Sequence, residues 1–347
     1  MTHWKLVTPF LRTKTQFWIH QFVAAPAHDF VAVSAHEFDV ITADYAHDRS
    51  RASTSAREWL DYLRQALRAR LAALRGPRPV GYITAFPPLA VCMGLVLRLT
   101  FSRAPLVAWS FNLSQRFSGP RRLAASFALA KACAVVVFSR REIKTYADML
   151  GLPPDRFVFV PFTEEMVEPT LAEETGSPFL LAMGTANRDY RTLLAAVARL
   201  DIPTVIVAGP RALAGLDLPP KVEVRSGLSL VECHALCQRA RLNVIPLDTE
   251  DTASGQVTLR YAMMFGKALV ATVSIGTEDY IEPGVTGLLV LPHDPSALEA
   301  AIAELWHNPA RRAAMGAAAR AWLLENAGFE VGPRRLREIL DKAAASA

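Results

Sequence analysis

The stretch LNVIPLDTEDTASGQVTLRYAMMFGKALVATVSIGTEDYIEPGVTGLLV, residues 242–290, contains the pattern that decides the fold of this chain. It begins with a short apolar strand, followed by a loop of small and polar residues. A helix that closes near Gly266 and a second apolar strand come next. Successive strand–loop–helix units predict a parallel sheet, because parallel neighbours need a helical crossover between them. We therefore expect an α/β protein.

The loop ahead of that helix is the first candidate binding site. It connects the carboxyl end of a strand to the amino end of a helix, where unpaired N–H groups and the helix dipole favour anions, phosphate above all. The small or polar residues Ser254, Gly255 and Gln256 would let a ligand approach the backbone, and Val257 and Thr258 follow in the first helical turn. An ordinary loop that binds nothing is the alternative interpretation of this pattern.

Strands and helices alternate in both halves of the chain, whose 347 residues suffice for about two domains. Residues 166–178 contain acids, Gly and Pro without periodicity and are interpreted as a linker. We expect two Rossmann-like, doubly wound parallel-sheet domains, 1–165 and 179–330, that face a cleft. A C-terminal helix, 333–347, is expected to pack back on the first domain.

Local patterns give more specific expectations. Residues Ser53–Leu74 form an amphipathic pattern, with apolar residues at helical spacing and arginines opposite; the stripe is Trp59, Leu60, Leu63, Leu67, Leu71 and Leu74. Ser229 and Glu232 have capping-box spacing. Asp294 before Pro295 predicts a helix start, with Leu298, Ile302 and Leu305 on the buried side. A strand is expected at DFVAVS, residues 29–34.

Charge is distributed unevenly. Residues 1–165 contain 21 Lys and Arg against 12 Asp and Glu, whereas the remainder contains 17 against 21. A basic first half beside apolar stretches is compatible with peripheral contact with an anionic membrane or with a phosphorylated acceptor. A solvated arginine-rich surface explains the charge equally well. No nucleic acid is expected, because no recognition motif or series of stacking aromatics accompanies the charge.

The cysteines and the apolar runs bear on location. Four cysteines are scattered without a disulfide framework or a complete zinc-ligand spacing, which suits a reducing compartment. The longest apolar run, residues 87–101, is shorter than a membrane span and carries Arg98. The amino terminus lacks the order of a signal peptide. We expect a cytoplasmic protein, with association to the cytoplasmic face of a membrane as an extension of the charge argument.

Residues 177–324 resemble the nucleotide-sugar glycosyltransferases of GT-B architecture, of the group 1 or family 4 kind. The resemblance rests on FLLAMGTANRDYRTLLAAV, YAMMFGKALVAT and GTEDYIEPGVTGLLVLPHDPSALEAAI. It implies a donor site for a nucleoside-diphosphate sugar and a glycan or lipid-linked acceptor. Arg188 stands where the family places a basic residue at the donor diphosphate. The first half agrees with the family only in architecture.

The sequence also departs from the family. Two glutamates that the family carries eight positions apart correspond to Ala253 and Tyr261, and Glu250 is the nearest substitute. A histidine common after the fourth strand of the acceptor domain is replaced by Phe111-Asn112. The resemblance therefore implies donor binding in a divergent member and leaves the sugar open.

The combined reading is a retaining glycosyltransferase that uses no cofactor. No Asp-x-Asp occurs in the sequence, so no metal is expected at the diphosphate. The catalytic candidates are His36, Glu250 and Asn112. The substrate-binding candidates are Gly184, Thr185, Arg188, Arg225, Ser226, Ser254, Gly255, Gln256, Val257 and Thr258. A nucleotide-sugar epimerase or hydrolase, and a non-catalytic binding member, are the alternatives.

Overall fold

A computed structural model describes residues 2–11, 19, 36–43, 54–76, 80–113, 117–249 and 253–345. The chain forms two compact units. Unit 1 consists of Met1–Glu164 and Phe329–Ala347, and unit 2 of Glu165–Gly328. Each unit has its own parallel sheet and its own apolar core. The α/β prediction is confirmed, while the expected strand at residues 29–34 lies outside the described residues.

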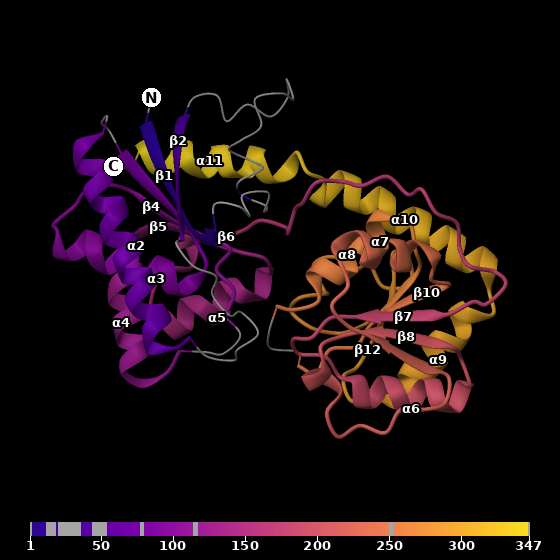
Figure 1. Ribbon diagram of the computed structural model, residues 1–347. Helices are drawn as coiled ribbons and strands as arrows, with labels where there is room; N and C mark the ends of the chain where they lie inside the picture. Colours follow the sequence, from indigo (N-terminus) through magenta and orange to yellow (C-terminus); the bar gives the residue numbers. More distant parts are fainter. Residues whose placement is uncertain are drawn as a thin grey trace. The chain divides into compact units, whose positions relative to one another are not determined.

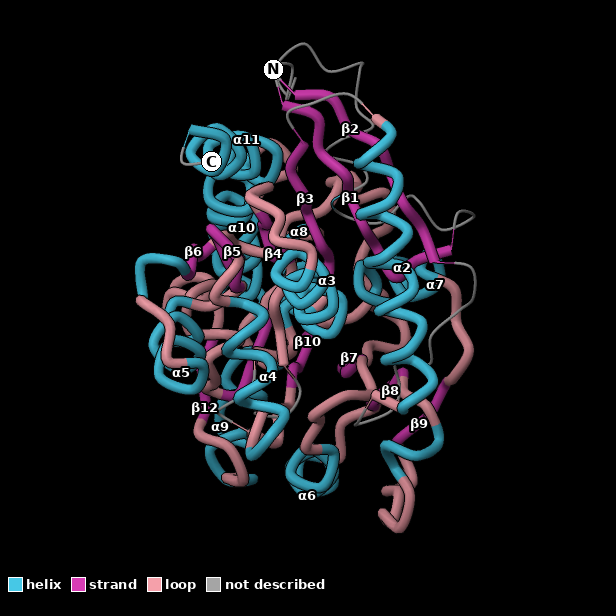
Figure 2. Tube along the Cα trace, turned by 90° about the vertical axis from the view of Figure 1, so that its left-hand side faces the viewer, coloured by secondary structure: helices cyan, strands magenta, loops and turns pink. Residues whose placement is uncertain are grey.

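Unit 1 contains a six-stranded parallel sheet in the order β2-β1-β3-β4-β5-β6 (Figure 1). Its strands are β1 (Thr2–Leu11), β2 (His36–Ala43), β3 (Val80–Ala85), β4 (Leu106–Trp109), β5 (Ala132–Val137) and β6 (Phe157–Phe159). The helices on one face are α2 (Ala56–Arg75), α3 (Pro87–Leu99), α4 (Gly119–Leu129) and α5 (Arg140–Leu150). Figure 2 shows α2, α3 and α4 side by side on the side that faces the viewer.

The opposite face of this sheet is covered by α11 (Val331–Ala345), the last helix of the chain. Leu336, Ile339 and Leu340 of α11 are buried against Trp4 and Val107 of the sheet. Side chains alternate across a strand, so the sheet contributes one set of residues to each face. The C-terminal helix is therefore part of the core of unit 1.

Helix α2 buries a different side from the one that its leucines mark. A capping box, in which Ser55 and Glu58 exchange hydrogen bonds, starts the helix within the predicted range. The core side consists mainly of small residues, with Ala66 and Ala69 fully buried, which lets the helix lie close to its neighbours. Most of the leucine stripe is exposed instead: Leu60, Leu67, Leu71 and Leu74 are 48%, 43%, 53% and 48% accessible.

Unit 2 contains a second six-stranded parallel sheet, in the order β12-β11-β10-β7-β8-β9. The strands are β7 (Leu180–Met183), β8 (Thr204–Val207), β9 (Val222–Arg225), β10 (Leu242–Ile245), β11 (Leu269–Thr272) and β12 (Leu288–Val290). The helices are α6 (Tyr190–Leu200), α7 (Leu230–Arg239), α8 (Gln256–Met264), α9 (Pro295–Trp306) and α10 (Pro309–Ala327). Helices α6 and α9 cover one face of the sheet, and α7, α8 and α10 the other (Figure 1).

Two predicted helix starts in unit 2 are confirmed. Ser229 and Glu232 form the capping box of α7. The Asp294 carboxylate caps α9 by accepting hydrogen bonds from two backbone N–H groups, with proline in the first turn. The apolar residues Leu298, Ile302 and Leu305 are buried as expected.

The segment interpreted as a linker belongs to unit 2, where ion pairs and hydrogen bonds attach it to the rest of the unit. The Glu173 carboxylate forms ion pairs with Arg241, Lys267 and Arg312, each at 3.3 Å. The Gln238 side-chain oxygen accepts hydrogen bonds from two successive backbone N–H groups of the segment, at 2.7 and 2.9 Å. Several contacts spread over α7, α8 and α10 therefore fix a stretch that has no regular secondary structure.

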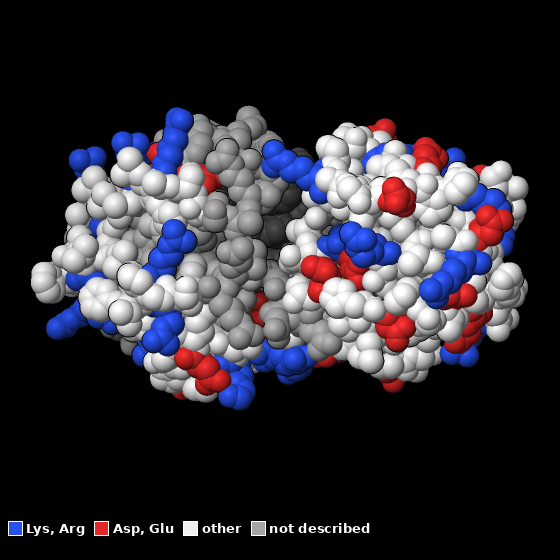
Figure 3. Space-filling view, turned by 90° about the horizontal axis from the view of Figure 1, so that it is seen from below, with Lys and Arg blue, Asp and Glu red and all other residues white. Residues whose placement is uncertain are grey.

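The surface charge of unit 1 agrees with the excess of Lys and Arg in the first half of the sequence. On the face shown in Figure 3, Lys and Arg are more common than Asp and Glu over the unit drawn on the left, which is unit 1. Among the described residues, every helix is too short or too polar to span a bilayer.

Candidate functional site

The strand order of unit 2 locates a candidate site before any side chain is considered. Strand β7 comes first in the chain, β8 and β9 follow on one side of it, and β10, β11 and β12 on the other. The winding therefore reverses between β7 and β10. In open parallel sheets, ligands bind outside the carboxyl ends of the strands at this reversal. The loops that follow β7 and β10 are the ones rich in candidate residues.

These two loops are joined by backbone contacts. The Asp189 N–H donates to the Pro246 carbonyl at 3.1 Å, and the Asp248 N–H donates to the Asn187 carbonyl at 3.2 Å. A β-bridge pairs Arg188 with Leu247 between them. The loops after β7 and β10 therefore form one connected surface at the reversal point.

The Arg188 side chain ties this surface to the helix that follows. Its guanidinium donates to the Met183 carbonyl at 3.0 Å, the Ala186 carbonyl at 2.8 Å and the Thr258 hydroxyl at 3.1 Å. Desolvation lowers the pKa of this guanidinium, which still remains charged at neutral pH. Three of its five N–H groups are used in these bonds, and the remaining two are the ones that could bind an anion.

The corner that starts α8 depends on close backbone packing. Gly255, the N-cap residue, has φ +86°, and a Cβ there would lie 3.0 Å from Ile245 and 3.3 Å from Leu247. Gly276, in the turn after β11, faces the Ser254 backbone so closely that a Cβ would overlap with it. Among the residues that the structure describes, no side chain caps the helix at Gly255. The inner side of the corner is thus packed, while Ser254, Gly255 and Thr258 stay partly exposed.

Gln256 is the most informative side chain at this corner. It is 7% exposed, and its amide nitrogen Nε2 is buried without a hydrogen-bond partner in the part of the chain that the structure describes. A buried amide without a partner costs roughly 1–3 kcal/mol. This donor lies in the first turn of a helix whose N–H groups lack an intrahelical partner. The corner therefore offers several donors and few acceptors, which is the composition of an anion site.

Arg225, Ser226 and Thr185, also predicted to bind substrate, lie at or just after the ends of strands, on the carboxyl edge of the same sheet. The Arg225 guanidinium forms a two-pronged ion pair with Glu223 at 2.7 and 3.0 Å, and this contact raises the pKa of Arg225. Ser226, the next residue, is exposed. Thr185 accepts a hydrogen bond from the Gly209 N–H at 3.3 Å, which joins the loops after β7 and β8. The structure does not place Arg225 and Ser226 in contact with the Arg188–Thr258 pair; they remain predictions.

A residue without a sequence signal supports the loop after β7. The Tyr190 hydroxyl donates to the Gly184 carbonyl at 2.6 Å, and burial raises the pKa of this hydroxyl to about 12. Tyr190 is 1% exposed and packs in the core of unit 2. Because the hydroxyl keeps its proton at physiological pH, it can always donate to the Gly184 carbonyl. This hydrogen bond fixes the backbone at Gly184, the first residue of the predicted donor loop.

One group of side chains among the described residues has metal-ligand spacing: Asp189, Asp248 and His293. Its members already contact one another. The Asp189 carboxylate accepts from the Thr192 N–H at 3.0 Å and lies 3.0 Å from Nδ1 of His293. The group thus connects the start of α6 to the loop after β12. These contacts explain why the three side chains lie close together.

The catalytic candidates of the first half lie at different edges of the sheet in unit 1. His36 begins β2, at the amino end of a strand, and its Nε2 is 2.9 Å from the Asp341 carboxylate of α11. Its ring also packs edge-on against Trp4. Asn112 follows β4 at the carboxyl edge and is partly buried. Glu250 lies outside the described residues. The edge rule favours Asn112 over His36 as a residue near substrate.

Ser110 is a residue at this carboxyl edge that the sequence did not reveal. Its φ is +55°, and its buried hydroxyl has no hydrogen-bond partner among the described residues. Strained backbone and unpaired polar groups concentrate at functional sites. Only the structure could show it, because the sequence WSFN carries no turn signal.

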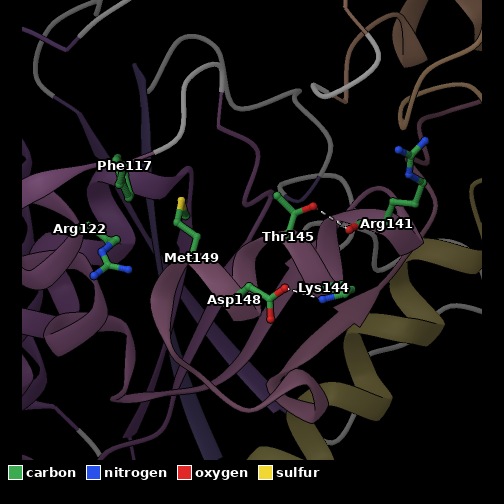
Figure 4. A pocket seen from close by; sticks show the side chains of 7 residues that line it. All are labelled: Phe117, Arg122, Arg141, Lys144, Thr145, Asp148 and Met149. Carbon is green, nitrogen blue, oxygen red and sulfur yellow. Dashed lines mark hydrogen bonds and ion pairs between the residues drawn. The ribbon is translucent and has the colours of Figure 1, made fainter.

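A basic groove of about 570 Å³ lies along α5 and beside the start of α4 (Figure 4). It is lined by Phe117, Arg122, Arg141, Lys144, Thr145, Asp148 and Met149. The Lys144 ammonium pairs with the Asp148 carboxylate at 2.6 Å, and Asp148 is the single acid of the lining. Three cations against one carboxylate make this groove attractive to an anionic group.

Two parallel six-stranded sheets, each in its own unit, define the GT-B architecture. Residues 177–308 match the model of the family "Glycosyl transferases group 1". The matched segment lies in unit 2 and covers less than half of the chain, and the fold is the GT-B fold that the sequence resemblance predicted.

Known proteins are similar to this chain at low sequence identity. The chain is 31% identical over 159 residues to the D-rhamnosyltransferase WbpZ of Pseudomonas aeruginosa, a match that spans 43% of this chain and only 41% of that protein. The structure is similar to a sucrose-phosphate synthase from Thermosynechococcus elongatus, with a TM-score of 0.76, 16% identity and 100% of both chains covered. It also resembles Anabaena Alr3699/HepE in complex with UDP and glucose, with a TM-score of 0.73, 14% identity, and 99% and 100% covered. At this identity, the structural matches establish the fold.

Proposed function

We propose that this protein is a glycosyltransferase that moves a sugar from a nucleoside-diphosphate sugar to a polysaccharide or lipid-linked acceptor. The observation that carries the proposal is the uncapped start of α8, with the buried amide of Gln256 and the Arg188 guanidinium beside it. The group 1 family match and the UDP complexes of a structural neighbour support a nucleotide-sugar donor.

The chemistry of transfer requires that the leaving diphosphate be stabilised as its negative charge grows. N–H groups in the first turn of α8 and the Arg188 guanidinium supply hydrogen bonds and positive charge at one place. Charge-assisted bonds of this kind strengthen as the charge develops, so they favour the transition state over the bound donor. The proposed mechanism holds the diphosphate with these groups and with no metal ion.

We propose a retaining outcome, as the family resemblance implies. In that case the departing phosphate oxygen takes the proton of the acceptor hydroxyl, and no histidine base is needed. The proposed mechanism therefore assigns no step to His36, whose Nε2 lies 2.9 Å from the Asp341 carboxylate. Asn112 remains the candidate that orients an acceptor. The basic groove at α4 and α5 would accommodate an anionic group of the acceptor, and the free cysteines fit a cytoplasmic location.

One observation favours a second function, that of a non-catalytic nucleotide-sugar-binding protein. The two positions that carry glutamates in the family are occupied by Ala253 and Tyr261, which are 3% and 7% exposed. Neither can present a carboxylate to the sugar hydroxyls. Donor binding through the phosphates would survive this loss even where transfer did not.

The experiment incubates the protein with UDP- and GDP-sugars, with and without candidate glycan and lipid-linked acceptors, and measures free nucleoside diphosphate. Acceptor-dependent release is the expected result. Release without acceptor indicates a hydrolase, and formation of an epimer indicates an epimerase. Saturable nucleotide binding without turnover would favour the binding protein over the transferase.

A further inference from the structure

The outer sides of α2, α3 and α4 in unit 1 expose an unusual number of large apolar side chains. On α2, the exposed leucines are spaced by seven, four and three residues, so they lie along one side of the helix. At the end of α3, Leu99 is 73% and Phe101 is 93% exposed. On α4, Leu123 is 65% and Phe127 is 51% exposed. Soluble surfaces seldom gather large apolar side chains in one region without a partner.

Contacts between neighbouring helices make these side chains parts of one surface. Arg70 of α2 donates to the Thr100 hydroxyl at the end of α3, at 3.2 Å. The Arg98 guanidinium of α3 lies over the Phe127 ring of α4, 4.3 Å from its centre. Figure 2 shows the three helices next to one another. We call this surface the arginine–leucine face: its apolar residues are Leu60, Leu67, Leu71, Leu74, Leu99, Phe101, Leu123 and Phe127.

The charge around these residues has a single sign. From residue 62 to residue 141 the sequence contains no Asp or Glu, whereas it contains twelve Arg and one Lys. The exposed members on the three helices and the turn after α3 are Arg64, Arg68, Arg75, Arg103, Arg121 and Arg122. An 80-residue stretch without one acid sets a strong positive potential over the arginine–leucine face.

Exposed apolar side chains together with arginines indicate what kind of partner this face binds. Apolar side chains rimmed by arginines fit a surface that is negative outside and apolar beneath, which describes an anionic lipid bilayer. A second copy of the chain fits poorly, because it would bring arginine-rich faces together. Two acids lie near the start of α2, Glu58 in the capping box and Asp61 paired with Arg64, and the other arginines of the face leave it net positive. Single-stranded nucleic acid would need a series of stacking aromatics rather than leucines.

We propose that the arginine–leucine face docks unit 1 on an anionic membrane. Leu99 and Phe101 insert at the lipid interface, the leucines of α2 lie along it, and the arginines contact the headgroups. Docking needs no transfer chemistry and goes beyond the proposed function. It would hold the enzyme where a lipid-linked acceptor is found.

Vesicle sedimentation with the full chain tests the proposal. The probes are phosphatidylcholine vesicles, alone or with about one quarter phosphatidylglycerol, at low and physiological salt. We expect binding to the anionic vesicles, weaker binding at higher salt, and little binding to phosphatidylcholine alone. Failure of the wild-type protein to bind the anionic vesicles would overturn the proposal.

Two double variants separate the apolar from the charged contribution. Leu99→Ser with Phe101→Ser is expected to lower the partition coefficient about tenfold or more at both salt concentrations. Arg64→Gln with Arg68→Gln is expected to lower it about tenfold at low salt and less at high salt.

Matched controls come from exposed residues of unit 2. These are Val231→Ser with Leu291→Ser, which are 77% and 62% exposed, and Arg191→Gln with Arg239→Gln. All four double variants should keep the wild-type melting temperature and nucleotide affinity, because the positions are exposed and lie outside the donor corner. If the unit 2 variants lose vesicle binding as strongly as those of unit 1, adsorption is non-specific and the proposal fails.

Two further outcomes also contradict membrane docking. The first is a concentration-dependent dimer that the Leu99→Ser, Phe101→Ser variant abolishes, with no vesicle binding, which would identify a second copy as the occupant. The second is binding to a homopolymer RNA without vesicle binding. Nucleotide binding by unit 2 is measured on the same samples, so loss of membrane docking is distinguishable from failure of the proposed transferase.

Discussion

Helices α7 and α8 begin at the same edge of the sheet in unit 2, yet their first turns differ. At α7, the Ser229 hydroxyl accepts from the Glu232 N–H at 3.3 Å, and the Glu232 carboxylate accepts from the Ser229 N–H at 2.7 Å. At α8, no side chain caps Gly255, and the Gln256 amide is buried without a partner among the described residues. The start of α7 satisfies its own hydrogen-bond donors, whereas we propose that the donors at the start of α8 bind a ligand. The contrast would then separate a structural helix start from a binding one.

The largest expected effect comes from Gly255→Val. A β-branched residue at φ +86° is strained by roughly 1–3 kcal/mol, and its Cβ would crowd Ile245 and Leu247. We expect the corner to shift and nucleotide binding, measured by titration calorimetry, to be lost. Gly215→Val, elsewhere in unit 2, is the matched control, because Gly215 has φ +75° with nothing within 4 Å of a Cβ. It should lose stability and keep its nucleotide affinity.

A Gly255→Val protein that melts early but keeps its turnover per folded molecule would give a different answer. In that case Gly255 serves backbone geometry alone.

Arg188→Ala is expected to weaken nucleotide binding by about 1.5–3 kcal/mol, because a charge-assisted hydrogen bond is lost. Calorimetry with UDP and GDP measures it. Arg211→Ala removes an exposed arginine from the same unit and should leave affinity unchanged. Arg225→Ala is expected to have a smaller effect than Arg188→Ala, since Glu223 already occupies its guanidinium. An unaltered affinity in Arg188→Ala would remove Arg188 from the site.

Gln256→Met tests the buried amide while nearly keeping the side-chain volume. We expect the ligand-free protein to become equally or slightly more stable, by up to ~1 kcal/mol, because an unpaired polar group is removed. Nucleotide affinity should fall by about 0.5–1.5 kcal/mol. Thermal melting with and without UDP measures both. Lower stability with unchanged affinity would mean that the amide has a partner in the ligand-free protein.

Ser229→Ala should have the smallest effect on function. Loss of the capping box costs about 0.5–2 kcal/mol of stability, and nucleotide affinity should stay the same. Hydrogen bonds from the Ser229 hydroxyl and N–H lower the pKa of the Glu232 carboxyl. The stability that these bonds contribute is therefore fully present at pH values above the ordinary pKa of glutamate. It is lost as the pH falls through the lowered pKa. Urea unfolding at neutral and acidic pH measures the difference. A change in affinity as large as that of Gln256→Met would erase the contrast between α7 and α8.

The sequence predicted unit 2 well, because its signals are local. A strand, a polar loop with Gly255 and an apolar helix can be recognised within a few residues, and so can the capping box at Ser229. The partners of Arg188 were not predictable, because Thr258 lies 70 residues away along the chain. The sequence marked both residues but not the hydrogen bond that joins them.

Unit 1 shows why periodicity alone is ambiguous. The leucines of α2 keep helical spacing, yet the side with small residues packs on the core. A helix with two apolar sides cannot be oriented from its own sequence, because either side can be buried. The role suggested for His36 stays a prediction, and its place in the strand was ambiguous for a similar reason: a histidine at a strand boundary gives no sign of whether it starts or ends the strand.

The three ion pairs of Glu173 have a practical consequence for dividing the protein. A fragment that starts at Phe179 would leave Arg241, Lys267 and Arg312 close together without their shared carboxylate, and like charges in partly buried positions repel. A recombinant fragment of unit 2 should therefore begin at Glu165 and end at Gly328. The complementary fragment needs Phe329–Ala347 supplied by a fusion or as a separate peptide, because that helix completes its core.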